Sequence, residues 1–313
     1  MINEIASLCL FSLICFGDQQ SSLFNNSQCQ EYNYLQDKIS LICNSDSQLE
    51  QYKQLPIHTL AINGTPNDIQ ETLVVTNFNH LIIQNAQFNV SSRQEGSHDK
   101  SIVHQSLTIV RSSNVAVWSW ANFNFKHIYF EDCLLNPIYE KSSHKVVTSD
   151  FLPSNLLSLS FINCRIVNIG YGALSFLNSI RSLTITHNHL TTFSRLALPD
   201  EAPDLWSIDL SYNKIETLSD SFTNNLPSLK ELNLRNNQLL TLPVDFFHSS
   251  LLLSLIDLAD NPLKCETFCW TFTNSSLSHP KLLDQTKCFL SNQASVILAW
   301  SNGTEVGCND PCI

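Results

Sequence analysis

The amino-acid sequence predicts an α/β repeat fold: a curved solenoid with a parallel sheet on its concave side and disulfide-bonded caps at its ends. Three observations predict it. An eleven-residue pattern, L-x-x-L-x-L-x-x-N-x-L, recurs through much of the 313-residue chain, and cysteines cluster before and after the recurring region. The chain also contains 31 Asn but only 7 Gly, so its many turns must rely on Asn. A single copy of such a pattern cannot bury its own apolar side, so the copies are expected to stack.

The pattern is most regular in the C-terminal half of the chain. The copies there are LLSLSFINCRI from Leu156, IRSLTITHNHL from Ile180, LWSIDLSYNKI from Leu205, LKELNLRNNQL from Leu229 and LSLIDLADNPL from Leu253. Every leucine position holds an apolar residue, and the Asn position holds Asn or Cys. Alternation along an extended chain turns the leucines of L-x-L into a core and the x side chains outward onto one shared sheet.

The copies closer to the N-terminus are less regular. The copy from Phe125 is clear, the copy from Phe78 lacks the Asn, and those near Ile57 and His104 match the pattern least well. Starts at 57, 78, 104, 125, 156, 180, 205, 229 and 253 predict about nine repeats over residues 57–263, with a polar insertion near residues 136–150.

The layout around these copies resembles the 24-residue class of leucine-rich repeat found in extracellular animal proteins. An apolar residue (Ala173, Phe222 or Phe246) stands seven positions before the next copy. The resemblance implies that the Asn turns inward and hydrogen-bonds backbone groups of its own and neighbouring repeats. Cys133 and Cys164 replace this Asn in two repeats. We expect buried structural thiols there, the alternatives being a bond between the two or a reactive thiol.

Caps are predicted over residues 18–56 and 264–313, because the open ends of a solenoid would expose its core. At the front, Cys29 and Cys43 are expected to pair, and Ile39 and Leu41 offer a strand that extends the sheet. At the back, NPLKCETFCW resembles the cysteine-flanked cap of extracellular leucine-rich repeat proteins. That resemblance implies the bonds Cys265 to Cys288 and Cys269 to Cys308, although four cysteines permit three pairings.

Cys312 remains as an odd cysteine after these assignments. It predicts a disulfide-linked homodimer, the alternative being that Cys312 takes the place of Cys308 in the cap.

The N-terminal segment predicts secretion. Residues 1–17 are interpreted as a signal peptide because an apolar run from Ile5 to Phe16 precedes Gly17, the alternative being a buried first helix. No later segment approaches the length of an apolar transmembrane helix. Eleven Cys favour an oxidising compartment. N-glycosylation is predicted at the N-x-S/T motifs of Asn25, Asn63, Asn89, Asn274 and Asn302. The mature chain is therefore expected to be a secreted, extracellular glycoprotein.

Composition and motifs exclude several function classes. The net charge of −11 and the lack of a basic run argue against nucleic-acid binding. Hydrolase, metalloprotease and nucleotide-binding fingerprints are missing, so no enzymatic activity and no cofactor are expected. No metal site is expected either, because no nearby His falls at ligand spacing to the C-terminal cysteines and secretion favours disulfides.

Three functions compete on this basis. The first is a secreted protein whose concave sheet binds an extracellular or cell-surface protein. The second is a structural matrix component resembling small leucine-rich proteoglycans, but their N-terminal cysteine cluster is represented here by Cys29 and Cys43 alone. The third is an extracellular enzyme inhibitor. We favour the first.

The alternation of the strands also predicts which side chains meet the ligand. With Ser158 and Ser160 between them, the predicted binding residues are His127, Tyr129, Glu131, Asp132, Thr184, Thr186, His187, Asp209, Ser211, Tyr212, Glu231, Asn233 and Arg235. Aromatic and Arg side chains among small hydroxyls suit a protein ligand. Given the acidic balance of the chain, the ligand surface is expected to be neutral or basic, so that salt weakens binding. Phe193, on the convex side, is expected to lie outside this surface.

Overall fold

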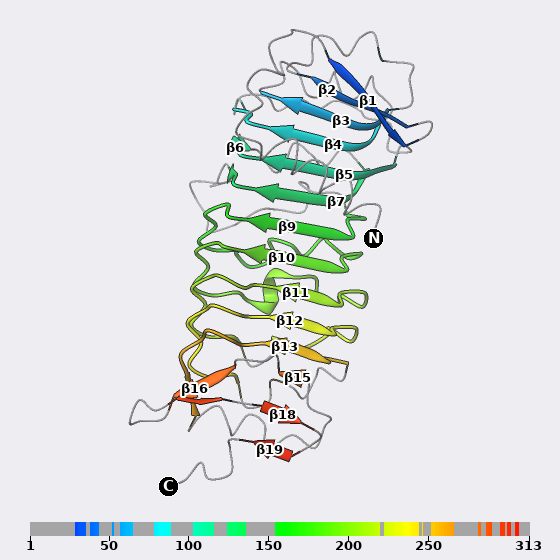
Figure 1. Ribbon diagram of the computed structural model, residues 1–313. Coiled ribbons are helices and arrows are strands. Elements are labelled where there is room, and N and C mark those ends of the chain that lie inside the picture. The colour runs from blue at the N-terminus through cyan, green and yellow to red at the C-terminus, as the bar shows by residue number, and fades with distance from the viewer. Residues whose placement is uncertain are drawn as a thin grey trace, which may run out of the picture.

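The computed structural model describes residues 29–35, 38–43, 52, 57–64, 78–88, 103–115, 124–135, 154–219, 222–243, 246, 252–265, 281–282, 286–289, 295–297, 299–301 and 304–306. Their strands stack one above another along the long axis of a solenoid (Figure 1). The predicted architecture, with a parallel sheet and disulfide bonds near both ends, is confirmed.

The main sheet has twelve strands in the order β1-β2-β3-β4-β5-β7-β9-β10-β11-β12-β13-β15. Their bounds are Gln30–Leu35 (β1), Lys38–Cys43 (β2), Ile57–Asn63 (β3), Phe78–Gln84 (β4), Val103–Val110 (β5), Asn124–Glu131 (β7), Ser158–Ile162 (β9), Ser182–Thr186 (β10), Ser207–Asp209 (β11), Glu231–Asn233 (β12), Leu255–Asp257 (β13) and Lys281–Leu282 (β15). β1 and β2 are antiparallel, and every later neighbouring pair is parallel.

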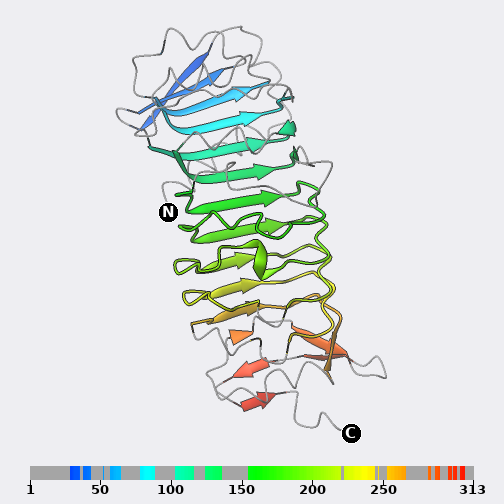
Figure 2. The ribbon, with the colours of Figure 1, turned by 180° about the vertical axis from the view of Figure 1, so that it is seen from behind.

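Shorter strands lie beside this sheet. They are Ser113–Val115 (β6) paired with Leu134–Leu135 (β8), Leu263–Lys264 (β14) with Lys287–Phe289 (β16) and Ser295–Ile297 (β17), and Ala299–Ser301 (β18) with Thr304–Val306 (β19). In the described part of the chain, the return segments hold one short 3₁₀-helix, Arg195–Ala197 (η3), visible from behind in Figure 2.

The core follows the predicted leucine positions. Residues such as Leu159, Leu183, Ile208 and Leu232 are buried and stand directly beside one another in register. Burial of such side chains is the main source of stability in a stacked repeat, since each repeat covers its neighbour. His104 occupies one of these leucine positions; it is buried, and its ring stacks on Phe78 with centroids 4.2 Å apart.

On the convex side, the return segments pack aromatic rings against one another. Phe193 contacts Phe222 edge-on, and Phe222 stacks on Phe246. Phe193 is only 2% exposed, so this side chain belongs to the core and not to the convex surface. Arg195 is also buried, and its guanidinium donates to the backbone oxygens of Pro199, Asp200 and Asn224, joining two successive return segments.

The Asn positions form a buried ladder of side-chain amides. Asn188, Asn213, Asn237 and Asn261 each donate from Nδ2 to two or three backbone carbonyls of their own and the preceding repeat. Each Oδ1 accepts a backbone N–H of the preceding repeat, for example Leu190 N to Asn213 Oδ1 at 3.2 Å. Because buried amides must be satisfied, the ladder locks neighbouring repeats in register.

Cys133 and Cys164 are free, buried thiols, as predicted. Cys133 Sγ donates to the carbonyl oxygens of Ile109 and Glu131, and Cys164 Sγ donates to those of Phe130 and Ile162. Each thiol therefore takes the place of the NH₂ group of the Asn side chain as a hydrogen-bond donor. Hydrogen bonding to the Cys133 thiol and burial raise the pKa of Cys164. A thiol held protonated is a poor nucleophile, which supports a structural role.

Two disulfide bonds lie near the ends of the solenoid. Cys29 bonds to Cys43, and Cys265 bonds to Cys288, confirming both pairings. β2, which contains Ile39 and Leu41, pairs with β3 and extends the sheet at its N-terminal end, as predicted. The predicted bond between Cys269 and Cys308, the odd Cys312 and the glycosylation sites Asn25, Asn89, Asn274 and Asn302 lie outside the described residues. No helix among those residues is long and apolar enough to cross a membrane.

Candidate ligand-binding surface on the concave sheet

The outward side chains of the sheet form straight rows across the repeats. One row, fixed by the parallel register, runs through Tyr129, Ser160, Thr184, Asp209, Asn233 and Asp257. A second runs through His80, Ser106, His127, Ser158, Ser182, Ser207 and Glu231. Polar side chains thus stand side by side at strand spacing, ~4.8 Å. Such rows offer one continuous surface to a ligand.

The predicted binding residues differ in how much surface they present. Asp132, His187, Tyr212 and Glu231 are exposed. His127, Tyr129, Glu131, Thr184, Asp209, Asn233 and Arg235 are partly exposed. Thr186 and Ser211, in contrast, are buried, at 6% and 4% exposure, and offer little to a partner. Both residues lie two positions before a ladder Asn, whose Nδ2 donates to their backbone oxygens.

The N-terminal part of the surface is rich in imidazole rings. His58 and His80 have ring centroids 4.9 Å apart, and His80 Nδ1 lies 2.7 Å from Ser106 Oγ. Sequence reasoning missed both histidines because it followed only the regular repeats. In the copies that start near Ile57 and Phe78, the alternation of inward and outward side chains would have indicated both histidines.

Tyr129 and Glu131 form one hydrogen-bonded pair on this part. The Tyr129 hydroxyl donates to Glu131 Oε2 over 3.1 Å. Burial, followed by the charge of Glu131 and this hydrogen bond, raises the pKa of Tyr129 above its usual value. The phenol therefore remains a hydrogen-bond donor under physiological conditions.

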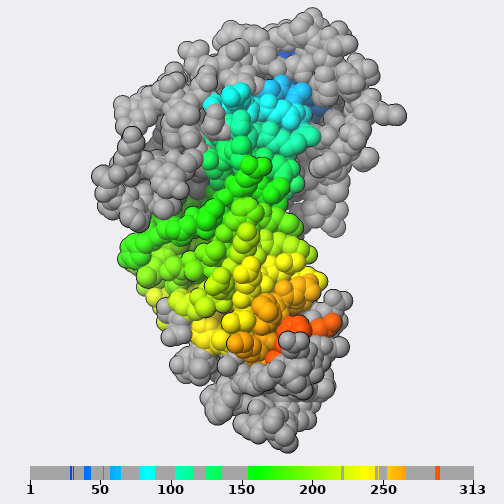
Figure 3. All heavy atoms as spheres, turned by 90° about the vertical axis from the view of Figure 1, so that its left-hand side faces the viewer, coloured from blue at the N-terminus to red at the C-terminus, as the bar shows by residue number. Residues whose placement is uncertain are grey.

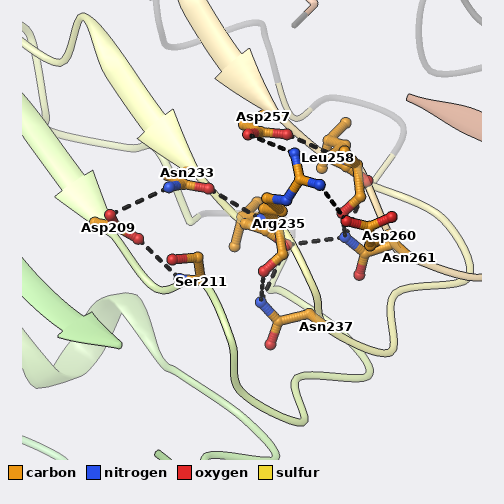
Figure 4. Close-up of polar contacts among 11 residues, drawn as sticks. Asp209, Ser211, Asn233, Arg235, Asn237, Asp257, Leu258, Asp260 and Asn261 are labelled. Atoms are coloured by element: carbon orange, nitrogen blue, oxygen red, sulfur yellow. Dashed lines mark hydrogen bonds and ion pairs between the residues drawn. The ribbon is translucent and has the colours of Figure 1, made fainter. Parts of the chain in front are cut away.

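The C-terminal part of the surface is organised by short polar side chains (Figure 4). Asp209, Asn233 and Asp257 each accept, through Oδ1, the backbone N–H two residues later. This local bond competes with continued strand pairing, which accounts for the three-residue length of β11, β12 and β13. Asn233 Nδ2 also donates to Asp209 Oδ2, so the row is rigid across repeats.

Arg235 is the cation of this part. Its guanidinium lies 2.5 Å from Asp260 Oδ2 and 4.0 Å from Asp257 Oδ2 (Figure 4). Desolvation opposes its charge, but Asp260 and Asp257 outweigh that effect and raise the pKa of Arg235. Asp209 and Glu231 add two further carboxylates to the same rows of outward side chains. The C-terminal half of the concave surface is therefore acidic.

The residue before each ladder position adopts a left-handed backbone. Asn85, Arg111, Asp132, Asn163, His187, Tyr212, Asn236 and Asp260 have φ between 48° and 59°. Asn, Asp and His tolerate this conformation best among residues other than Gly, whereas other side chains adopt it at a cost. Even so, two neighbouring repeats place His187 and Tyr212 there, and their rings stack with centroids 4.2 Å apart. An exposed aromatic pair thus marks the edge of the sheet at the carboxyl ends of the strands.

Metal chemistry has no support in this part of the molecule. Among the described residues, no group of three or more His, Cys, Asp or Glu side chains is placed to hold a metal ion.

Comparisons with known proteins agree with the fold. A family model described as leucine rich repeat matches residues 203–263. The chain is 31% identical over 117 residues to Toll-like receptor 9 of Mus musculus, covering 37% of this chain and 11% of the receptor. It is 28% identical over 137 residues to leucine-rich repeat-containing protein 3 of Danio rerio, covering 44% of this chain and 50% of that protein.

Among solved structures, InlP of Listeria monocytogenes superimposes with a TM-score of 0.53 at 18% identity, covering 69% of this chain and 59% of that chain. The likeness concerns the fold alone. The matched family model and the stacked parallel strands identify a leucine-rich repeat region in this chain. The aligned segments span at most half of the two curated relatives.

Proposed function

We propose that the protein is secreted and binds an extracellular or cell-surface protein through the concave side of its sheet. The observation that carries this proposal is the exposed pair of His187 and Tyr212, whose rings stack beside the rows of outward side chains. Most of the other repeats fill this turn position with Asn or Asp, so an exposed aromatic pair there supports selection for binding. Tyr is also a frequent anchor of protein interfaces.

Secretion is supported by independent features. The bonds Cys29–Cys43 and Cys265–Cys288 fit an oxidising compartment. The apolar run before Gly17 and the five glycosylation motifs point the same way. The first relative is named a receptor, which agrees with a binding role.

The glycosylation motif at Asn63 helps to delimit the proposed surface. Asn63 ends β3, and its Oδ1 accepts a hydrogen bond from Asn85 Nδ2, leaving its own Nδ2 for a glycan. A glycan there would cover the first strands of the concave side. The ligand is therefore expected to contact β7 to β13.

The test is a comparison of concave and convex substitutions. Immobilised wild-type protein is used to capture its ligand from extracellular fluid, and the purified ligand is then titrated against Tyr129→Ala with Tyr212→Ala. Loss of two aromatic anchors should weaken binding by more than roughly tenfold.

The matched control is Tyr171→Ala in the return segment between β9 and β10, where the side chain is 77% exposed. Phe193 is unsuitable as a control because it is buried. Tyr139, in the polar insertion near residues 136–150, is a second tyrosine expected to lie off the concave face, but it is outside the described residues. If Tyr171→Ala weakens binding while the folded tyrosine pair variant binds normally, the concave assignment is wrong.

A further inference from the structure

A row of basic side chains runs along the outer edge of the sheet, past the carboxyl ends of β9, β10 and β11. Arg165, His189 and Lys214 occupy the same position in three successive repeats, one residue beyond the ladder, and all three are exposed. Regular backbone bonds hold them in register: His189 N donates to Ile166 O and Lys214 N to Leu190 O, both at 2.8 Å. The strand arrows of Figure 1 point toward this edge.

Figure 3 views the molecule from that side, and the described residues between 154 and 265 form a coloured surface through its middle. The row lies directly beside His187 and Tyr212, which belong to the same two repeats as His189 and Lys214. We call Arg165, His187, His189, Tyr212 and Lys214 the edge patch.

The cations of the edge patch are not neutralised by the part of the chain that the structure describes. Arg235, one repeat further on, is held by Asp257 and Asp260. Arg165 and Lys214, in contrast, form no ion pair with any described residue. In a chain of net charge −11, two exposed cations without an ion pair to a described residue stand out on this edge.

The geometry of the patch matches an extended acidic polypeptide. Arg165 and Lys214 are two repeats apart, which corresponds to ~10 Å at the spacing of parallel strands. Carboxylates three residues apart on a chain in the extended polyproline II conformation lie on one side of it, ~9 Å apart. His187 and Tyr212, whose rings stack with centroids 4.2 Å apart, lie in the same repeats as His189 and Lys214, and Arg and Tyr are the side chains enriched at interface hot spots.

We propose that the edge patch binds a carboxylate-rich, extended segment of the protein ligand. This inference rests on the proposed function, because the patch continues the concave surface through the shared His187 and Tyr212. The acidic part of the concave surface, with Asp209 and Glu231, then faces a neutral or basic part of the same ligand. Opposite charges on two adjoining surfaces fix the orientation of the partner.

The experiment uses poly-L-glutamate as probe and the full secreted chain. The test variant is Arg165→Glu with Lys214→Glu. The control is Arg181→Glu with Lys230→Glu, an equal charge change on exposed cations that also lie two repeats apart, at the amino ends of β10 and β12. Folding is checked by circular dichroism. The test variant should lose roughly tenfold or more in affinity, and the control should stay within about twofold of the wild type.

Other outcomes overturn the proposal. Equal losses in both variants would mean that total charge, not the edge patch, governs binding. Wild-type binding to heparin but not to poly-L-glutamate would assign the patch to an anionic polysaccharide. The captured ligand separates the two proposals: if the Tyr129 and Tyr212 variant loses it while the Arg165 and Lys214 variant retains it, the concave surface stands and the edge patch does not.

Discussion

The repeats before and after residue 165 satisfy their turns in different ways. In the earlier repeats the ladder positions hold Ala86, Ser112, Cys133 and Cys164, whereas in the later ones they hold Asn. The earlier strands β3, β4, β5 and β7 are seven or eight residues long, while β11, β12 and β13 have three. β9, with Cys164 at its ladder position, and β10, with Asn188, are both five residues long, so the ladder side chain alone does not set the strand length.

The largest expected effect separates these two kinds of ladder. Asn213→Ala removes an amide with four backbone partners, so it should lower the free energy of unfolding by about 3 to 5 kcal/mol. Cys164→Ala removes a weak donor and should cost about 1 kcal/mol. Denaturant unfolding of both variants measures the difference. Equal losses would show that the amide ladder has no special role.

The next largest effect is the loss of stability when a disulfide bond near either end of the solenoid is removed. We expect similar losses at the two ends. Cys288→Ser opens a loop of 23 residues in sequence separation, and Cys43→Ser opens one of 14. Loop entropy depends weakly on length, so each should cost roughly 3 kcal/mol. Secreted yield and melting midpoint test this expectation. A variant that is secreted and melts like the wild type would contradict it for that bond.

The smallest expected effect is a loss of stability at alkaline pH that arises from Tyr129, in the earlier repeats. The raised pKa of Tyr129 means that the folded state holds its proton more tightly than the unfolded chain, whose tyrosines titrate near pH 10. The associated stability is fully present below about pH 10 and is lost as the pH rises above it. Tyr129 is only partly buried, so the effect is modest.

Tyr129→Phe should therefore flatten the decline of the melting midpoint above about pH 10. Tyr171→Phe, a change at an exposed tyrosine in a return segment, is the control. If both variants decline like the wild type, the contact between Tyr129 and Glu131 does not contribute to the pH dependence.

The sequence alone was sufficient for the architecture. It predicted the core positions, the inward Asn, the buried Cys133 and Cys164, and two disulfide bonds. The core and ladder positions recur about every 24 residues. Because several copies show the same pattern, an atypical residue in one copy does not change the prediction. The same periodicity explains why the less regular repeats contributed less, and why His58 and His80 were overlooked.

Tertiary structure decided which outward residues reach a ligand. Alternation holds only while the chain is extended, and at the left-handed residue it ends, so Thr186 and Ser211 are buried while His187 and Tyr212 emerge at the edge. Likewise, Arg235 is paired with Asp257 and Asp260 of the next repeat, whereas Lys214 has no ion pair with any residue that the structure describes. Spacing along the chain carries no information about such contacts between repeats, since they depend on which side chains the stacking brings together.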